Sequence, residues 1–156
     1  MPLPPFAVFL EQHRTLVYRF LIGTVGAQAA DDCFQETFLS ALRAYVRLRD
    51  DSNLRAWVLA IASRKAIDHR RGERRRPMLV ADVPERAAPP APGVEPRVRR
   101  EVQALPRLQQ AAVVLRYALD LPYAEVAQVL GCSEEAARAS AYAGRKKLRT
   151  RLEGRR

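Results

Sequence analysis

A proline-rich stretch in the middle of the chain places the strongest limit on its fold. Six of the eleven prolines lie within residues 77–96, and this stretch contains no aromatic residue. Because a segment of this composition can bury little apolar surface, it is predicted to be an extended, flexible linker. The chain is therefore expected to form two small domains, residues 1–76 and residues 97–156, on either side of it.

Helical periodicity runs through the sequence on both sides of the linker. Apolar residues recur three and four positions apart, as on one face of an amphipathic helix. In the first domain this pattern predicts helices over about residues 4–22, 28–48 and 54–76. The buried stripe of the second helix is expected to consist of Phe34, Phe38, Leu42 and Tyr45.

The second domain is predicted to contain shorter helices, over about residues 97–105, 106–119, 122–130 and 134–152. Pro106 and Pro122 suit the first turn of a helix, where a missing N–H has no cost. No alternation typical of β-strands occurs over a useful length. The predicted fold class is all-α, with two small helical domains joined by a Pro-rich linker.

The charge of the chain points to a polyanionic partner. Lys and Arg number 27 against 17 Asp and Glu, a formal net charge of +10. Such a surplus favours nucleic acid, and on charge alone an anionic membrane surface is the competing interpretation. The sequence has no apolar run long enough to span a bilayer and no secretory signal, so membrane insertion is not expected.

Side chains that could perform catalysis or bind a metal are few and scattered. Cys33 and Cys132 lie far apart, and with His13 and His69 they form no zinc-type spacing. A disulfide is not expected either, which fits a reducing cytoplasm. The sequence also lacks a Gly-rich phosphate loop and a nucleophile–base pair. We therefore expect no cofactor, no metal and no enzymatic activity.

The second domain carries the spacing of a helix-turn-helix. Ala127 is small enough to let two helices cross closely, and Gly131 four positions later permits a tight turn. Ser133 can cap the next helix, and Ala137 is expected to face inward. In this motif the second helix enters the major groove of DNA. Residues 145–156 then add seven basic side chains and one acid, which strengthens the prediction of DNA binding.

Three further segments extend this interpretation to nearly the whole chain outside the linker. Residues 30–39 read ADDCFQETFL, residues 53–71 read NLRAWVLAIASRKAIDHRR, and residues 104–117 read ALPRLQQAAVVLRY. Together with the helix-turn-helix that follows, these segments resemble regions two and four of the sigma-70 family. The resemblance is to its extracytoplasmic-function group, in which the first two segments are usually written AEDLVQETFL and PRAWLFRIARNLAIDHLR.

The resemblance implies an alternative sigma factor, which binds core RNA polymerase and directs promoter recognition and transcription initiation. The implied partners are the β′ clamp helices and β flap of the polymerase, promoter DNA and, by analogy, an anti-sigma factor. Core-polymerase binding is implied for Asp31, Asp32, Gln35 and Glu36. Binding to the minus-ten element is implied for Arg47, Arg49, Asn53, Arg64, Lys65, His69 and Arg71. Binding to the minus-thirty-five element is implied for Arg138, Ser140, Tyr142, Arg145 and Lys146.

The sequence departs from the family pattern in two places. Arg64 replaces a common Asn, which can change the pocket for an unpaired base. The recognition helix carries Ser140, Ala143 and Gly144 where the family has larger side chains, and Gly144 is expected to cost about 1 kcal/mol of helix stability relative to Ala.

Two other interpretations remain open at this point. The first is a stand-alone helix-turn-helix regulator that binds a duplex operator as a dimer, with the first domain as a sensor. The second is a polymerase-binding adaptor that no longer reads promoters, as the weakened recognition helix suggests.

Overall fold

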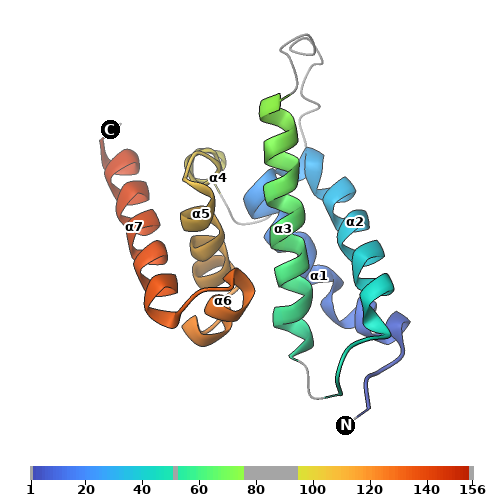
Figure 1. Ribbon diagram of the computed structural model, residues 1–156. Coiled ribbons are helices and arrows are strands. Elements are labelled where there is room, and N and C mark those ends of the chain that lie inside the picture. Colours follow the sequence, from blue (N-terminus) through green and yellow to red (C-terminus); the bar gives the residue numbers. More distant parts are fainter. Residues whose placement is uncertain (1, 51–52, 76–94, 155–156) are drawn as a thin grey trace.

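A computed structural model describes residues 2–50, 53–75 and 95–154, with the side chains of 73–75 left out. Within these ranges the chain is helical and contains no strand (Figure 1). The N-terminal lobe comprises α1 (Phe6–Val25), α2 (Ala27–Tyr45) and α3 (Leu54–Arg75). The C-terminal lobe comprises α4 (Pro96–Gln103), α5 (Arg107–Val113), the π-helical turn η2 (Val114–Ala118), α6 (Tyr123–Leu130) and α7 (Glu134–Glu153).

The predicted fold class is confirmed: the molecule is all-α, with two helical lobes. The helices begin and end within a few residues of the expected positions. Pro106 and Pro122 each lie one residue before their helix, at the N-cap, and Pro96 takes the first helical position instead. Residues 77–94 of the predicted linker lie outside the described residues.

An aromatic cluster holds the N-terminal lobe together. The ring of Phe9 lies 5.1 Å from that of Tyr45 and 5.8 Å from that of Trp57, measured between centroids. The ring of Phe38 also contacts that of Phe9, and Phe38 is 6 % exposed. The three rings come from α2 and α3, so this contact joins all three helices. It also packs the half-buried Trp57 against the core.

The buried stripe of α2 differs from the predicted one. Leu42 was expected to be buried and is 49 % exposed, so that prediction is wrong. The inner face of α2 instead runs through small residues, namely Ala30, Cys33, Thr37 and Ala41. Small side chains let α1 and α3 approach α2 closely, and a pattern that weighs large apolar residues overlooks them.

The helix-turn-helix forms as its sequence predicts. Gly131 adopts a left-handed conformation with φ +66°, and the Ser133 hydroxyl accepts a hydrogen bond of 3.1 Å from the Ala136 N–H. Ala137 and Ala141 are fully buried on the inner face of α7. The turn residue, the cap and the inward alanine were all identified correctly from the sequence.

Gly144 has a packing role that its sequence context did not reveal. It is buried on α7, and a β-carbon there would lie 2.6 Å from Cγ2 of Val113 and 3.2 Å from the carbonyl oxygen of Gln109. Both neighbours belong to α5, so the glycine allows α7 to pack directly against that helix. The position of Gly144 therefore lies in the core of the lobe and not on the exposed face of α7.

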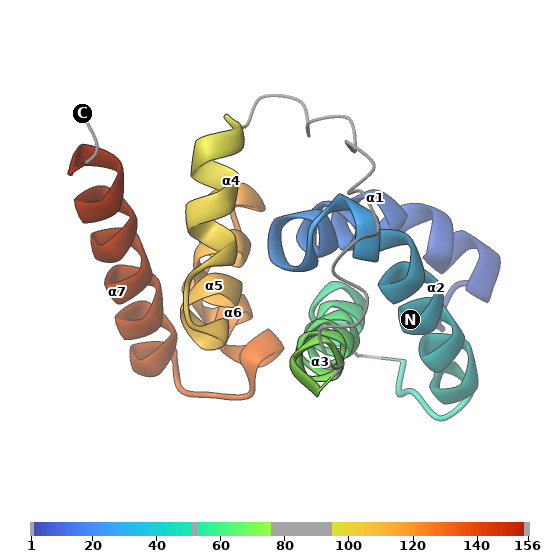
Figure 2. The same ribbon diagram turned by 90° about the horizontal axis from the view of Figure 1, so that it is seen from above.

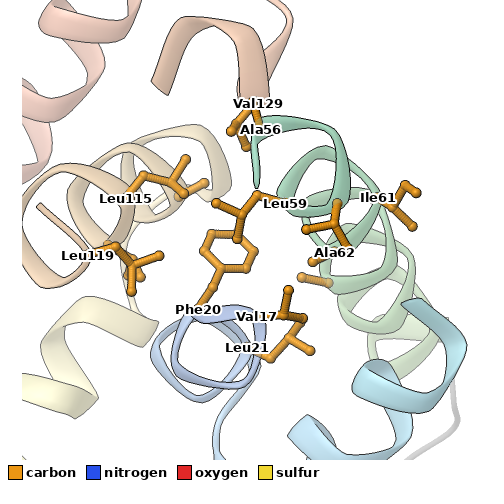
Figure 3. Packing of buried hydrophobic residues seen from close by; sticks show 14 of the residues in the cluster. Val17, Phe20, Leu21, Ala56, Leu59, Ile61, Ala62, Leu115, Leu119 and Val129 are labelled. Carbon is orange, nitrogen blue, oxygen red and sulfur yellow. The ribbon is translucent and has the colours of Figure 1, made fainter. Parts of the chain in front are cut away.

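The two lobes share one apolar cluster, which the sequence did not predict. Phe20 and Leu59 of the N-terminal lobe meet Leu115, Leu119 and Val129 of the C-terminal lobe (Figure 3). Viewed from above, α1 and α3 both border the C-terminal lobe, and α2 lies on their far side (Figure 2). In this conformation the lobes thus form one continuous core.

Membrane insertion was not expected, and none of the helices in the described ranges has the length and apolar character to cross a bilayer.

Replacement of Gly144 by Ala is expected to lower the free energy of unfolding by about 1–2 kcal/mol, because overpacking against Val113 outweighs the gain in helix propensity. The matched control is Gly72→Ala in α3, where a β-carbon meets no atom within 4 Å. That variant is expected to be more stable by about 0.5–1 kcal/mol. Urea unfolding followed by circular dichroism measures both. A stabilised Gly144→Ala protein would contradict the packing role.

Candidate nucleic-acid interface

The residues singled out in the sequence fall on three exposed surfaces. The first is the outer side of α2, which we call the α2 surface. The second comprises the outer face of α3 and the residues before it, which we call the α3 surface. The third is the outer face of α7, which we call the α7 surface. Figure 1 shows that the three belong to different helices, with the α7 surface in the C-terminal lobe.

The α2 surface begins with polar and acidic side chains. Asp31, Asp32, Gln35 and Glu36 are all exposed. Because α2 begins at Ala27, the two aspartates lie beyond its first turn. Asp31 accepts a hydrogen bond from the Tyr18 hydroxyl, and burial together with this carboxylate raises the pKa of Tyr18.

Exposed apolar residues continue the α2 surface towards the end of the helix. Leu39, Leu42 and Val46 are 53 %, 49 % and 85 % exposed. Their spacing of three and four residues places them on one side of the helix and its last turn. Contiguous exposed apolar side chains mark an interaction site. Sequence reasoning missed Leu39 and Val46, although both are large apolar residues outside the predicted buried stripe.

The α3 surface carries a cationic face. Arg64 and Arg71 are exposed and lie within about 20° of each other around the helix. Lys65 and His69 are half-buried beside them. Arg47 and Arg49 are exposed in the segment after α2. These side chains make this part of the N-terminal lobe predominantly positive, and one acid, Asp68, is exposed between Arg64 and Arg71.

Asn53 differs from the rest of the α3 surface because both of its side-chain polar atoms have partners. Its Oδ1 accepts the Ala56 N–H at 3.2 Å and so caps α3. Its Nδ2 donates to Glu125 Oε1 at 3.1 Å and to Gln128 Oε1 at 3.4 Å. Glu125 and Gln128 belong to α6, so the cap residue also contacts the C-terminal lobe.

The α7 surface brings most of its predicted residues onto one face. Arg138, Tyr142 and Arg145 lie within about 60° of one another around α7, with Lys146 next to them. All four are exposed, and Tyr142 reaches 67 %. Ser140 is half-buried and lies about 200° from Arg138, so it points away from this face.

Aromatic rings and a carboxylate hold the arginines of the C-terminal lobe. The guanidinium of Arg138 lies 5.1 Å from the centroid of the Tyr123 ring and donates to Glu134 Oε1 at 2.8 Å. Arg116 packs on Tyr123 as well, at 4.9 Å, and Arg145 lies 5.6 Å from the ring of Tyr117. Neither tyrosine was predicted as a site residue. The sequence does offer a hint of both: Tyr123 is the first residue of the first helix of the helix-turn-helix, and Tyr117 lies shortly before it.

Metal chemistry has no support in the arrangement of the described residues, which hold no group of three or more His, Cys, Asp or Glu side chains that could bind an ion. Cys33 is buried as expected, and Cys132 is half-buried against the core.

Two family models match the chain. Residues 9–76 match the family model of sigma-70 region 2, and residues 96–148 match that of sigma-70, region 4. The two matches cover the N-terminal and the C-terminal lobe, with the proline-rich stretch between them.

Proteins with similar sequences or folds are named as sigma factors. The chain is 35 % identical over 130 residues to the ECF RNA polymerase sigma factor SigC of Mycobacterium tuberculosis, covering 80 % of this chain and 70 % of the relative. It is 33 % identical over 150 residues to the ECF sigma factor BldN of Streptomyces coelicolor, covering 88 % and 56 %. The fold is similar to that of the sigma factor RpoE in complex with the anti-sigma factor NepR from Bartonella quintana, with a TM-score of 0.78 at 22 % identity, covering 97 % and 98 %.

Two helical lobes, a capped helix-turn-helix and cationic outer faces together define a bacterial transcription initiation factor. The chain belongs to the extracytoplasmic-function group of the sigma-70 family. It is an alternative sigma factor, which directs RNA polymerase to promoters.

Replacement of Tyr123 by Leu is expected to weaken binding of the polymerase complex to promoter DNA about two- to fivefold, because the ring that orients Arg138 is lost. Tyr123→Phe keeps the ring and should bind like the unaltered protein. Promoter binding measured by electrophoretic mobility shift compares the two. Equal losses for Leu and Phe would show that the hydroxyl group matters and that the ring does not.

Proposed function

We propose that the three surfaces divide the work of promoter recognition. The α3 surface binds the minus-ten element, the α7 surface binds the minus-thirty-five element, and the α2 surface docks on core RNA polymerase. The observation that carries this proposal is the common exposed face of Arg138, Tyr142 and Arg145 on the second helix of a capped helix-turn-helix. The chain itself performs no catalysis and requires no cofactor or metal, since the polymerase supplies the chemistry.

At the minus-ten element, the task is to hold a strand whose bases are unpaired. Extrusion of a base costs a few kcal/mol, which backbone neutralisation and pocket contacts must offset. The exposed cations Arg47, Arg49, Arg64 and Arg71 supply the neutralisation, with Lys65 and His69 beside them. Asn53, with an amide that both donates and accepts hydrogen bonds, is the residue suited to read a base edge.

At the minus-thirty-five element, position along α7 separates two roles. Arg138 lies in the second turn of the helix, where side chains of a recognition helix reach base edges. Arg145 and Lys146 lie about two turns further along, close to the phosphate backbone. Ser140 is half-buried and contributes little to either contact.

Docking on the polymerase uses the α2 surface. Gln35 and Glu36 provide hydrogen-bonding and acidic groups for the β′ clamp helices, and Leu39 and Leu42 extend the contact with apolar area. An acidic and apolar face is unusual on a chain of net charge +10, which supports a protein partner at this place over DNA. The C-terminal lobe makes a second contact, with the β flap.

Regulation by an anti-sigma factor is part of the proposal. Structures with the same fold include the sigma factor RpoE bound to the anti-sigma factor NepR, and this chain is proposed to have such an inhibitor as well. A factor that serves RNA polymerase works in the cytoplasm, which is the proposed location.

In vitro transcription of genomic DNA with core RNA polymerase, read by sequencing the 5′ ends of the transcripts, tests the function directly. Addition of the chain is expected to create start sites that core enzyme alone does not use, with a shared upstream motif. If the chain bound duplex DNA tightly on its own and created no start sites, it would be a stand-alone regulator.

The docking surface is tested by replacing Gln35 with Ala and Glu36 with Lys. Affinity for core polymerase is expected to fall at least tenfold, since a repulsive charge enters the contact, while helical content stays unchanged. Glu11→Lys, the same charge change at an exposed position of α1, is the matched control. Surface plasmon resonance with immobilised core enzyme gives the affinities. If Glu11→Lys lowered the affinity by the same factor, the loss would be due to net charge and not to a specific docking surface.

The division of roles along α7 predicts different losses for two substitutions. Arg138→Ala is expected to cost about 1–3 kcal/mol at a promoter with its own minus-thirty-five element and much less when that element is scrambled. Lys146→Ala should weaken both promoters alike and reduce the salt slope by about one unit. Both are measured with the polymerase complex over a range of salt concentrations. Equal losses at both promoters for Arg138→Ala would mean that α7 positions the polymerase without reading sequence.

A further inference from the structure

We propose that the conformation described here is a closed state of the free factor, in which Glu125 of α6 holds the promoter-binding end of α3. The C-terminal lobe then competes with promoter DNA for Asn53. The part of this inference that concerns DNA rests on the proposed function, and the part that concerns the contact between the lobes does not.

Glu125, Arg55 and Asn53 together form a polar contact between the lobes, which we call the latch. Glu125 is at its centre. The Arg55 guanidinium approaches the carboxylate with two nitrogens: Nε lies 2.7 Å from Oε2, and Nη2 donates to Oε1 at 2.9 Å. Asn53 Nδ2 donates to the same Oε1 at 3.1 Å. The hydrogen bonds to Glu125 raise the pKa of Arg55, as expected for a guanidinium with a close carboxylate.

Burial makes the latch specific for the closed state. Glu125 is only 8 % exposed, and a carboxylate at that depth is costly unless it is paired. The partners described above, Arg55 and Asn53, both belong to the N-terminal lobe. Glu125 also lies at the N-terminal end of α3, where a negative charge is favourable. Separation of the lobes would remove these partners and return the carboxylate to water.

A second polar contact closes the opposite end of α3. Arg70 Nη2 donates to the carbonyl oxygen of Thr24 at 2.7 Å and to that of Gln103 at 3.0 Å, so one guanidinium joins the ends of α1 and α4. The apolar contact between Phe20, Leu59 and Leu115 lies between the two polar ends (Figure 3). The interface between the lobes therefore consists of an apolar contact with polar contacts at both ends.

In the closed state the two DNA-binding surfaces are too close together to bind both promoter elements at once. The two promoter elements are centred about 25 base pairs apart, or about 85 Å at 3.4 Å per base pair. In the structure, α6 is within hydrogen-bonding distance of Asn53 through Glu125, and within 5.1 Å of Arg138 through Tyr123. One eight-residue helix, about 12 Å long, thus bridges residues proposed to bind the two elements. The lobes must separate before both elements can be bound.

The order of binding follows from what the closed state leaves accessible. Gln35 and Glu36 on the α2 surface are exposed, so polymerase can dock on the closed factor. The side-chain Nδ2 of Asn53 donates to Glu125 and Gln128 of α6, so this donor is withheld until the lobes part. The latch thereby withholds Asn53 from DNA and leaves the free factor competent to meet the polymerase.

The test uses the full-length chain with Glu125→Gln and Arg55→Ala, as single variants and combined. Glu101→Gln is the matched control, because Glu101 is also 8 % exposed and its ion pair, with Arg151 at 3.7 Å, lies within the C-terminal lobe. Small-angle X-ray scattering of the free protein measures the opening without DNA or polymerase. Fluorescence anisotropy with a short, labelled single-stranded DNA of mixed sequence measures access to the α3 surface.

Both single variants are expected to increase the radius of gyration and to raise the affinity for the single-stranded DNA about tenfold, since the affinity scales with the fraction of open molecules. The double variant should add little to either, because both changes break the same contact. Glu101→Gln should resemble the unaltered protein in both measurements. Circular dichroism establishes whether the variants are folded. If Glu125→Gln does not fold, Arg55→Ala alone tests the inference.

Two results would overturn the inference. An unchanged radius of gyration in folded variants would show that Glu125 does not hold the lobes together. A larger radius without a gain in DNA affinity would show that the latch exists but does not cover the DNA-binding end of α3. The function itself is judged separately, by whether the unaltered chain creates start sites with core polymerase.

Discussion

The burial of α3 on two sides is the constraint on which the rest of the structure depends. One side of this helix packs on the aromatic cluster of the N-terminal lobe, and the other meets the C-terminal lobe through Leu59. A helix buried on two sides leaves a narrow strip for solvent, and Arg64, Asp68 and Arg71 occupy that strip. The position of the cationic face therefore follows from packing on both sides of the helix.

Small residues determine how the other two surfaces are presented. On α2, the inward line of Ala30, Cys33 and Ala41 leaves Leu39 and Leu42 on the outside, next to the acidic groups. On α7, Ala137, Ala141 and Gly144 pack against the lobe and turn Arg138 outward. In both helices, close approach on one side decides which large side chains remain available for partners.

Much of the fold could be predicted from the sequence because it depends on local chemistry. Helical periodicity located every helix, and the turn at Gly131, the cap at Ser133 and the inward Ala137 followed from residue type and spacing. The burial of Leu42 was predicted wrongly, because it depends on which side of α2 faces its neighbours. Tyr123 was missed since its contact with Arg138 crosses from one helix to another.

The sequence by itself determined the helices, the helix-turn-helix and the membership of the chain in its family, because each of these is encoded by residues close together along the chain. Only the tertiary structure decided that the lobes share a core and that Glu125 meets Asn53 and Arg55. Those partners are 72 and 70 residues away in sequence, and no local pattern encodes such a pairing. Burial selects it, because a carboxylate removed from water is stable only where the fold brings donors to it.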